Sequence, residues 1–453
     1  MVERVKAAEI KRVIEFIRKE KKEVKLLLRK LDPKDFPFIL GRLPKEEVLE
    51  LILLLPDDVI KDFIAKLPLE VLLGILTSMD RGRLVRIASM LPADELSDLI
   101  GKLPIQHRRI LLKELPAFKL EEVKPLLGYS PTTAGGLMTN RIPRFFENLR
   151  VEQVVNEYVA RFKLEEYDTS NYVYAIDDKG RLTGAIDVKE LLLTPRNKQL
   201  KEVVRPQLRV VRPDVDQEEV AKIMARYDLS ELPVVDADNK LLGVVTLDDA
   251  VDVIINESSE DLIKFGGFTQ KPIAPYLTAK TVELVKKRAT WLTLLCLLEA
   301  ITATVVSRFE FVISTMAALT FFLPLIIDTG GNSGSQASSF VIRSLAVGEV
   351  TLYDALKVLM KESLTSVGLG LMVSPLAFAV SLLVTRELLL SFIVAAAMIL
   401  VVFIGGVIGS LLPILAAKLR IDPATVSSPL LTTIVDIVGL LTYFTLALLV
   451  LKL

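Results

Sequence analysis

The sequence predicts a multidomain membrane protein with a helical repeat domain, an α/β domain and an all-helical domain that crosses the lipid bilayer. Three observations support this prediction: an uneven charge distribution, Leu-Pro pairs at a fixed interval, and long apolar stretches near the C-terminus. Of 56 Lys and Arg residues only 8 lie from Trp291 onward, and of 56 Asp and Glu residues only 9. This separation is typical of a membrane protein with an extramembrane domain. The formal net charge of zero indicates no nucleic-acid partner.

The first residues indicate where the charged half of the chain lies. Glu3, Arg4 and Lys6 interrupt any apolar segment, so we expect no signal peptide and a cytosolic N-terminal half. Cys296 is the single cysteine, which rules out an internal disulfide framework and says little about the compartment.

Leu-Pro pairs recur at an interval of twelve residues within residues 1–128. Asp80 stands at the one position of the series that lacks Pro. Because Pro is tolerated in the first turn of a helix and resisted in its interior, each pair predicts the start of a short helix. Apolar residues recur at helical spacing between the pairs, so we expect an α-solenoid. The pairs begin at Leu43, Leu55, Leu67, Leu91, Leu103 and Leu115.

Residues 129–255 contain two similar segments at an offset of 59 residues. The first reads Tyr172-Val-Tyr-Ala-Ile-Asp177 and then Gly184-Ala-Ile-Asp187. The second reads Leu232-Pro-Val-Val-Asp236 and then Gly243-Val-Val-Thr246. Each predicts a strand, a turn, a strand and a helix, and a further helix over Gln217–Tyr227 precedes the second copy.

These two segments resemble a tandem pair of CBS modules, an α/β regulatory fold. The second copy carries the resemblance best, whereas the first has Asp187 and Lys189 at the family's Thr and Asp positions. CBS pairs often bind adenine nucleotides, although pairs that bind none are common. The resemblance therefore implies ATP or another adenine nucleotide as a candidate regulator, with Thr246 and Asp249 holding the ribose.

Five apolar stretches lie in residues 288–453, and each approaches or exceeds the roughly 20 residues that a helix needs to cross a bilayer. The fourth has thirty residues without a charge, so we expect tilt or a kink at Gly405, Gly406 or Pro413. A bundle of buried helices in a soluble protein is the alternative. The stretches cover roughly residues 289–307, 311–342, 363–385, 388–417 and 429–451.

The positive charges of the short loops predict the orientation. Most lie between spans two and three or between spans four and five, which places these loops and the N-terminal half in the cytosol and the C-terminus on the external side. We therefore expect a multi-pass protein of the cell (inner or plasma) membrane. The residues are Arg343, Lys357, Lys361, Lys418 and Arg420 on the inner side, against Arg308 and Arg386 on the other.

Asp436 is the one charged residue of the last span. An unpaired carboxylate in hydrocarbon is costly, so we expect it to face a water-filled path and to meet a cation. A protonated Asp that is hydrogen-bonded between helices is the alternative.

A second polar segment, Asp328-Thr-Gly-Gly-Asn-Ser-Gly-Ser-Gln336, interrupts span two and offers oxygen ligands from Thr329, Asn332 and Gln336. Close helix packing is the alternative for its small residues. His107 is the single histidine and lies in the cytosolic half, so oxygen ligands favour Mg²⁺, Ca²⁺ or Mn²⁺ over softer metals.

Along almost its whole length the chain resembles the MgtE family of magnesium channels. The segments that carry the resemblance are Ala134-Gly-Gly-Leu-Met-Thr139, Asp216-Gln-Glu-Glu219, Thr329-Gly-Gly-Asn332 and Ser428-Pro-Leu-Leu-Thr-Thr-Ile-Val-Asp436. The resemblance implies a homodimer with a helical N domain, a CBS pair, a connecting "plug" helix within residues 256–287 and five spans in each subunit. Beyond the second copy, the sequence identifies no protein partner.

The resemblance also implies a pore. Asp436 of both subunits would hold a hydrated Mg²⁺, Thr432 would present its backbone carbonyl to the same ion, and Gly330, Gly331 and Asn332 would line the path. Three residues depart from the family pattern: Ser428, Asp328 and Glu299.

Acidic residues around the end of the second CBS module form a like-charged surface. Divalent ions that bridge them would remove the repulsion and compact the cytosolic half, so we expect a Mg²⁺ sensor that closes the channel. A solvated acidic surface is the alternative. The predicted sensor residues are Asp216, Glu218, Asp228, Asp249, Asp252, Glu257, Glu260 and Asp261, together with Asp94 and Asp98 on one helix face and the backbone carbonyl of Gly136.

Two other functions are alternatives to a channel. An intramembrane enzyme would use Asp328 and Asp436 as a carboxylate pair, but no Gly-x-Gly-Asp sequence surrounds Asp436. A cation-coupled secondary transporter would use Asp436 as a coupling site, although five spans cannot form two equal halves.

Overall fold

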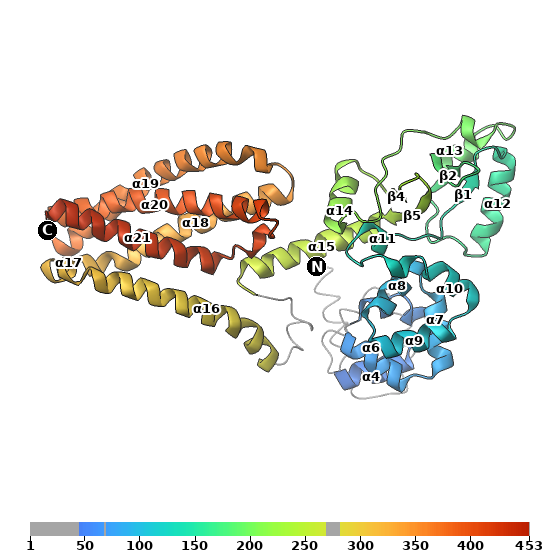
Figure 1. The fold of residues 1–453 in the computed structure, drawn as a ribbon, viewed down its shortest axis with the longest axis horizontal. Helices are drawn as coiled ribbons and strands as arrows, with labels where there is room; N and C mark the ends of the chain where they lie inside the picture. Colours follow the sequence, from blue (N-terminus) through green and yellow to red (C-terminus); the bar gives the residue numbers. More distant parts are fainter. Residues whose placement is uncertain (1–44, 68, 269–280, 453) are drawn as a thin grey trace, which may run out of the picture. The chain divides into compact units, whose positions relative to one another are not determined.

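The computed structural model describes residues 45–67, 69–268 and 281–452, and the chain divides into two compact units (Figure 1). The first unit holds the short helices and the strands, and the second holds the long helices. The division falls inside helix α15 (Leu247–Phe265), between Glu257 and Ser258. The predicted boundary between the CBS pair and the plug helix therefore lies within one continuous helix.

Short helices begin the first unit, and the Leu-Pro pairs separate them as predicted. Pro92, Pro104 and Pro116 are each the N-cap residue of a ten- or seven-residue helix. Asp80 takes the same position before α7, where its side chain accepts a hydrogen bond from the Arg83 N–H at 3.1 Å. The helices are α4 (Lys45–Leu54), α5 (Asp57–Ile60), α6 (Leu69–Ser78), α7 (Arg81–Met90), α8 (Ala93–Lys102), α9 (Ile105–Glu114) and α10 (Ala117–Val123), with 3₁₀ turns η2 (Ile64–Lys66) and η3 (Leu126–Gly128). Leu43-Pro44 and Pro68 lie outside the described residues.

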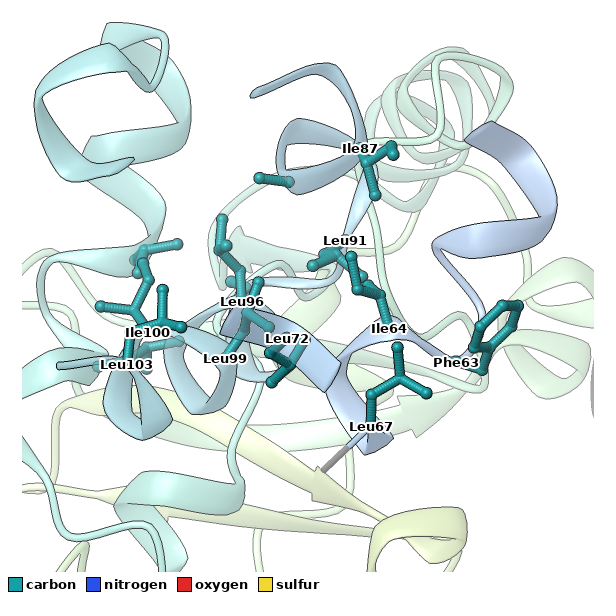
Figure 2. Close-up of a cluster of buried hydrophobic side chains, with 14 of the residues drawn as sticks. Phe63, Ile64, Leu67, Leu72, Ile87, Leu91, Leu96, Leu99, Ile100 and Leu103 are labelled. Atoms are coloured by element: carbon teal, nitrogen blue, oxygen red, sulfur yellow. The ribbon is translucent and has the colours of Figure 1, made fainter. Parts of the chain in front are cut away.

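Among the described pairs, each Leu belongs to the core. Leu91 and Leu103 are the C-cap residues of α7 and α8, and both are buried in the hydrophobic cluster that Figure 2 shows. The same continuous core extends into the second α/β module, where it includes Leu232. The helical repeats and the second module are therefore packed as one body.

The α/β region contains two small sheets. In the first, β1 pairs in parallel with β2, and β2 pairs antiparallel with β3; in the second, β4 pairs antiparallel with β5. The elements are α11 (Ala134–Leu137), β1 (Arg144–Phe146), α12 (Val151–Lys163), β2 (Tyr172–Ile176), β3 (Leu182–Asp187), α13 (Val188–Leu193), η4 (Leu200–Glu202), α14 (Gln217–Arg226), β4 (Glu231–Val235) and β5 (Leu241–Thr246).

The repeat at an offset of 59 residues is confirmed by these strands. At this offset the residues of β2 correspond to those of β4, and the residues of β3 to those of β5. Each strand pair also has a register shift at the equivalent position. Even the turns match: Asp177 accepts a hydrogen bond from the Arg181 N–H at 2.8 Å, and Asp236 from the Lys240 N–H at 2.9 Å. Such Asx-type turns are a local consequence of a short acidic side chain after a strand.

The second unit is all-helical. Among the described residues, four helices are long and apolar enough to cross a membrane: Thr281–Arg308, Leu352–Thr385, Leu388–Lys418 and Ser428–Leu451. The predicted second span is broken into α17, η5 and α18, and α18 lacks the required apolarity because it carries the polar segment from Asp328 to Gln336. The elements are α16 (Thr281–Arg308), α17 (Glu310–Thr315), η5 (Ala317–Phe322), α18 (Leu323–Ala346), η6 (Leu352–Asp354), α19 (Ala355–Thr385), α20 (Leu388–Lys418), η7 (Pro423–Thr425) and α21 (Ser428–Leu451).

Helix α20 is continuous through the positions where we expected a kink, with Pro413 inside it. Its glycines instead allow α18 to approach closely. A Cβ atom on Gly405 would lie 2.4 Å from the Gly330 carbonyl oxygen, and one on Gly409 would lie 2.2 Å from the Gly334 carbonyl oxygen. Any larger side chain would force the two backbones apart, so these glycines are required for packing.

Candidate cation sites

Asp436 lies on α21 at its contact with α18. A Cβ atom on Gly331 would lie 3.0 Å from Thr432 Cγ2 and 3.6 Å from Asp436 Oδ1, so the missing side chain lets α18 reach these two residues. Asp436 is half-buried, and within the described structure its Oδ1 atom is buried without a hydrogen-bond partner. A buried carboxylate oxygen with no donor is a position that a cation or its bound water can fill.

Two further carboxylates lie in the surroundings of Asp436. Glu299 on α16 and Asp328 on α18 both repel it electrostatically. Glu299 also accepts a hydrogen bond from the Thr433 hydroxyl at 3.0 Å, which joins α16 to α21. Three helices therefore contribute acidic groups to one region, and two of these groups are the residues that depart from the family pattern.

The other residues predicted to line the pore differ in their surroundings. Gly330 is buried against α20, where a Cβ atom would lie 2.4 Å from Val401 Cγ1, whereas Asn332 is exposed. The Thr432 hydroxyl donates to the Pro429 carbonyl oxygen at 3.0 Å. Ser428, which stands where the family pattern has Asn, forms a hydrogen bond with Ser335 at 2.9 Å.

In the first unit, α8 places Asp94 and Asp98 one turn apart, as predicted from their spacing. Burial raises the pKa of Asp94 well above its ordinary value of 3.8, and the nearby charges of Asp249, Asp168 and Glu95 raise it further. Burial also raises the pKa of Asp98. The structure thus brings Asp94 of the helical repeats near Asp249 of the second α/β module.

Asp168 was not predicted from the sequence, and it connects this region to a network of ion pairs. The Asp168 carboxylate accepts a hydrogen bond from the Thr139 hydroxyl, and its Oδ1 atom lies 3.5 Å from Arg141 Nη1. Arg141 Nε also lies 3.6 Å from Glu122 Oε1, and Lys119 Nζ lies 3.0 Å from Glu122 Oε2. No local pattern marks these residues, because they come from separate segments that only the fold joins.

Several predicted sensor residues already have local structural roles. Asp216 is the N-cap of α14 and accepts a hydrogen bond from the Glu218 N–H at 2.9 Å, while the Glu218 carboxylate lies 2.8 Å from Lys222 Nζ. Asp228 adopts a left-handed backbone with φ of 52° and is exposed. Gly136 packs so closely on the Ser130 carbonyl oxygen that a Cβ atom would lie 2.2 Å from it.

Helix α15 carries five predicted sensor residues, and the division between the two units separates them. In the first unit Glu257 accepts a hydrogen bond from Gln217 at 2.6 Å. In the second unit Lys264 Nζ lies 2.7 Å from both Glu260 and Asp422. These carboxylates are thus engaged by an amide and an ammonium group of the chain itself.

The remaining predicted residues lie along the same helix. Asp249, Asp252 and Asp261 all belong to α15. The Thr246 hydroxyl donates to Asp249 at 2.5 Å, so the two residues predicted to hold a nucleotide contact each other. In the part of the chain that the structure describes, no three His, Cys, Asp or Glu side chains converge as a metal site.

Family models match three regions of the chain. The MgtE intracellular N domain matches residues 31–132, the CBS domain residues 200–256, and MgtE, described as a divalent cation transporter, residues 323–446. A solved structure titled as the cytosolic domain of the Mg²⁺ channel MgtE in complex with ATP is 30% identical, with a TM-score of 0.49, and the match covers 55% of this chain and 99% of that one.

Two curated relatives match over most of their length. The magnesium transporter MgtE of Bacillus subtilis is 31% identical over 441 residues, which are 97% of this chain and 96% of that protein. The magnesium transporter MgtE of Thermus thermophilus is 38% identical over 331 residues, which are 73% of each chain. By this identity and coverage, the chain belongs to the MgtE family of divalent cation transporters.

Proposed function

We propose that this chain is a magnesium channel that passes Mg²⁺ along Asp436 and closes when cytosolic Mg²⁺ binds its acidic residues. Both relatives are named magnesium transporters, which supports Mg²⁺ as the transported ion. The observation that carries the proposal is the contact of Gly331 with Thr432 and Asp436, where a carboxylate oxygen has no hydrogen-bond donor in the described structure. Asp436 itself lies within the last of the four apolar helices that are long enough to cross a membrane.

A carboxylate suits this ion because Mg²⁺ prefers oxygen ligands and releases its water reluctantly. We propose that a hydrated ion meets Asp436 of two subunits, with the backbone carbonyl of Thr432 and the exposed Asn332 beside the path. Glu299 and Asp328 add negative potential at the same place. α18 supplies the predicted second span and so completes the set of five. Its polar face meets water instead of lipid, and for this reason the helix is less apolar than the other four.

The test is Mg²⁺ flux into proteoliposomes. Asp436→Ala is expected to abolish flux while the protein still folds, and Asp436→Asn is expected to behave similarly if the charge attracts the ion. Asp354→Asn, which removes a carboxylate from a 3₁₀ turn of the same unit, is the control and should keep normal flux. If Asp436→Ala keeps wild-type flux, the proposed pore is wrong. If Asp436→Asn keeps normal flux while Asp436→Ala loses it, Asp436 has a structural hydrogen bond and does not attract the ion by its charge.

Flux measurements in the same vesicles distinguish a channel from a cation-coupled transporter. A channel carries Mg²⁺ current at a rate independent of proton and sodium gradients, whereas a coupled transporter stops when its coupling gradient is collapsed. We propose the channel, in an orientation with the charged half in the cytosol. Flux that vanishes on adding a protonophore at fixed membrane potential would overturn this choice.

Adenine-nucleotide regulation is the remaining part of the proposal. It rests on the match of residues 200–256 to the CBS domain. Thr246 and Asp249 are already joined by a hydrogen bond, so a ribose would have to replace or extend it. Calorimetric titration of the full chain and of the Thr246→Ala variant with ATP tests this part of the proposal. If the wild type shows no binding heat, nucleotide regulation is ruled out.

A further inference from the structure

A pocket of about 380 Å³ lies between α18 and α19 in the second unit. This volume is at the lower end of the range for small-molecule sites, roughly 300–1,000 Å³. Both helices pack on α20 far more extensively than on each other, so the pocket occupies the space that they leave between them. Its inner wall consists of buried residues, Ser333, Ala337 and Val341 of α18 and Ser366 of α19. The packing of these helices on α20 therefore shapes the pocket.

The pocket lies on the face of α18 opposite to Asp436. Gly331 is the residue of α18 that contacts Asp436, whereas Phe340 lines the pocket. Phe340 follows Gly331 by about two and a half helical turns, at 3.6 residues per turn, so the two residues lie on opposite sides of the helix. The pocket is therefore separate from the proposed ion path along Asp436, and its ligand need not be the transported ion.

Two charged residues line the pocket near the beginning of α19, and they are Lys361 and Glu362. After them, no Asp, Glu, Lys or Arg occurs from Ser363 to Thr385, a segment long enough for the roughly 20 residues that cross the hydrocarbon of a bilayer. Charged side chains that border such a segment lie at the level of the lipid head groups, where long side chains such as Lys reach the polar interface. The charged end of the pocket is therefore at the depth of a lipid head group.

The two charges have opposite signs, and within the described residues neither side chain forms an ion pair or a hydrogen bond. Lys357, one turn earlier on the same helix, differs: its Nζ atom lies 2.9 Å from Asp354 Oδ1, and neither of these two residues lines the pocket. A ligand with one negative and one positive group would compensate both charges of the pocket, through charge-assisted hydrogen bonds that are stronger than neutral ones. Phospholipids with a primary ammonium group carry this pair of charges.

We propose that this pocket binds the head group of a phosphatidylethanolamine lipid. The Lys361 ammonium group donates to the lipid phosphate, and the primary ammonium group of the lipid donates to the Glu362 carboxylate. The exposed amide of Gln336 donates to an ester carbonyl, and the acyl chain contacts the exposed side chains of Phe340 and Leu369. Phosphatidylcholine fits less well because its quaternary ammonium group has no N–H, and phosphatidylglycerol because its head group carries no positive charge.

The test is the binding of short-chain lipids to the full-length protein in detergent. Native mass spectrometry with dioctanoyl phosphatidylethanolamine, phosphatidylcholine and phosphatidylglycerol gives an apparent dissociation constant for each lipid. We expect phosphatidylethanolamine to bind most tightly, by roughly three- to tenfold, the effect of one charge-assisted hydrogen bond at a partly exposed site. It should also raise the thermal unfolding temperature more than the other two lipids, because a ligand stabilises the state that binds it.

Two variants each remove one charge and nearly keep the volume of the side chain. Lys361→Gln should weaken the binding of all three lipids, because every one of them carries the phosphate. Glu362→Gln should weaken phosphatidylethanolamine most and abolish its preference over phosphatidylglycerol, because the acceptor for the primary ammonium group is lost. The difference between the two variants separates recognition of the phosphate from recognition of the ammonium group.

Lys357→Gln and Asp354→Asn are the matched controls, because they remove one charge of each sign at the start of the same helix, outside the pocket. Both should bind the three lipids as the wild type does. Equal affinity of the wild type for all three head groups would indicate only a general lipid shell and would overturn the proposal. Absence of lipid binding, or equal losses in the control and pocket variants, would overturn it as well. Since no ion flux is measured, the result is independent of the proposed channel.

Discussion

At the scale of single residues, the acidic side chains of this protein differ in what surrounds them. Within the described residues Asp436 has a buried carboxylate oxygen with no hydrogen-bond donor, whereas the buried Glu231 of the first unit accepts hydrogen bonds from several donors. Glu231 accepts hydrogen bonds from Tyr174 at 2.7 Å and from Thr169, so it ties the second α/β module to the first. The surroundings of Asp436 are suited to binding an ion, whereas those of Glu231 satisfy the carboxylate and stabilise the fold.

Glu231 makes the first unit sensitive to pH. Burial raises the pKa of the Glu231 carboxyl above its ordinary value of 4.5, although the hydrogen bonds from Thr169 and Tyr174 lower it. Between 4.5 and the raised pKa the folded state holds more protons than the unfolded state, so the free energy of unfolding falls as pH rises. Below this window the stabilisation is complete.

Glu231→Gln should remove this dependence. We expect hydrogen exchange at β4 in the wild type, relative to the variant at the same pH, to become faster as pH rises through the window. Comparison at equal pH cancels the intrinsic exchange rate. An identical pH response in both proteins would show that Glu231 does not titrate there.

Glu299 gives a prediction for transport. Glu299→Gln keeps an oxygen that accepts from Thr433 but removes a charge that acts on Asp436. The Mg²⁺ concentration for half-maximal flux should rise roughly two- to tenfold, because a nearby negative charge attracts the cation. Glu387→Gln, an exposed carboxylate before α20, is the control and should show no change. Equal values for Glu299→Gln and wild type would remove Glu299 from the ion's surroundings.

At the scale of helices and strands, close backbone contacts and local capping determine the arrangement. α18 and α20 approach each other through Gly405 and Gly409, and the polar segment of α18 is placed against α21 by the same contact. The position of Asp436 relative to Gly331 thus depends on how tightly α18 packs on α20.

Gly409→Ala should therefore impair both stability and transport. Its Cβ atom would lie 2.2 Å from the Gly334 carbonyl oxygen, and such overpacking costs about 1–3 kcal/mol. Gly368→Ala is the matched control on α19, since apart from its chain neighbours and its own helix backbone no described atom lies within 4 Å of the added Cβ, and it should be neutral or slightly stabilising. Thermal unfolding in detergent and flux should be measured for both; a stable, active Gly409→Ala protein would contradict the packing role.

Elements governed by local chemistry were predictable from the sequence, and contacts between distant segments were not. Pro92, Pro104 and Asp80 begin helices because each residue constrains its own backbone or caps the next turn. The pairing of Asp168 with Arg141 and the burial of Lys119 depend on how separate segments pack, which no spacing encodes. The break of the second apolar stretch into α17, η5 and α18 was also missed, since its apolar composition continues across the break.

At the scale of the whole molecule, the proposed gating depends on the carboxylates of α15. Replacing Glu257, Glu260 and Asp261 together with Ala should leave the channel open at high cytosolic Mg²⁺. A ligand shifts an equilibrium only by its differential affinity for the closed state, and that difference is lost with the ligands. The repulsion between these groups is lost as well, so a channel held closed is the opposite outcome.

Patch recordings at stepped cytosolic Mg²⁺ distinguish these outcomes. The triple variant should conduct where the wild type has closed, with an unchanged single-channel current, because Asp436 is untouched. Closure at the wild-type Mg²⁺ concentration would remove these three residues from the sensor.

The continuity of α15 across the division between the two units has a mechanical consequence. The helix has 19 residues without a break, and at about 1.5 Å per residue it is a rod of about 28 Å. Its first turn follows β5 directly, so its direction is set by the second α/β module. Lys264, near the end of this rod, lies 2.7 Å from Asp422 just before α21, so any displacement of this end of α15 acts directly on the start of the last span.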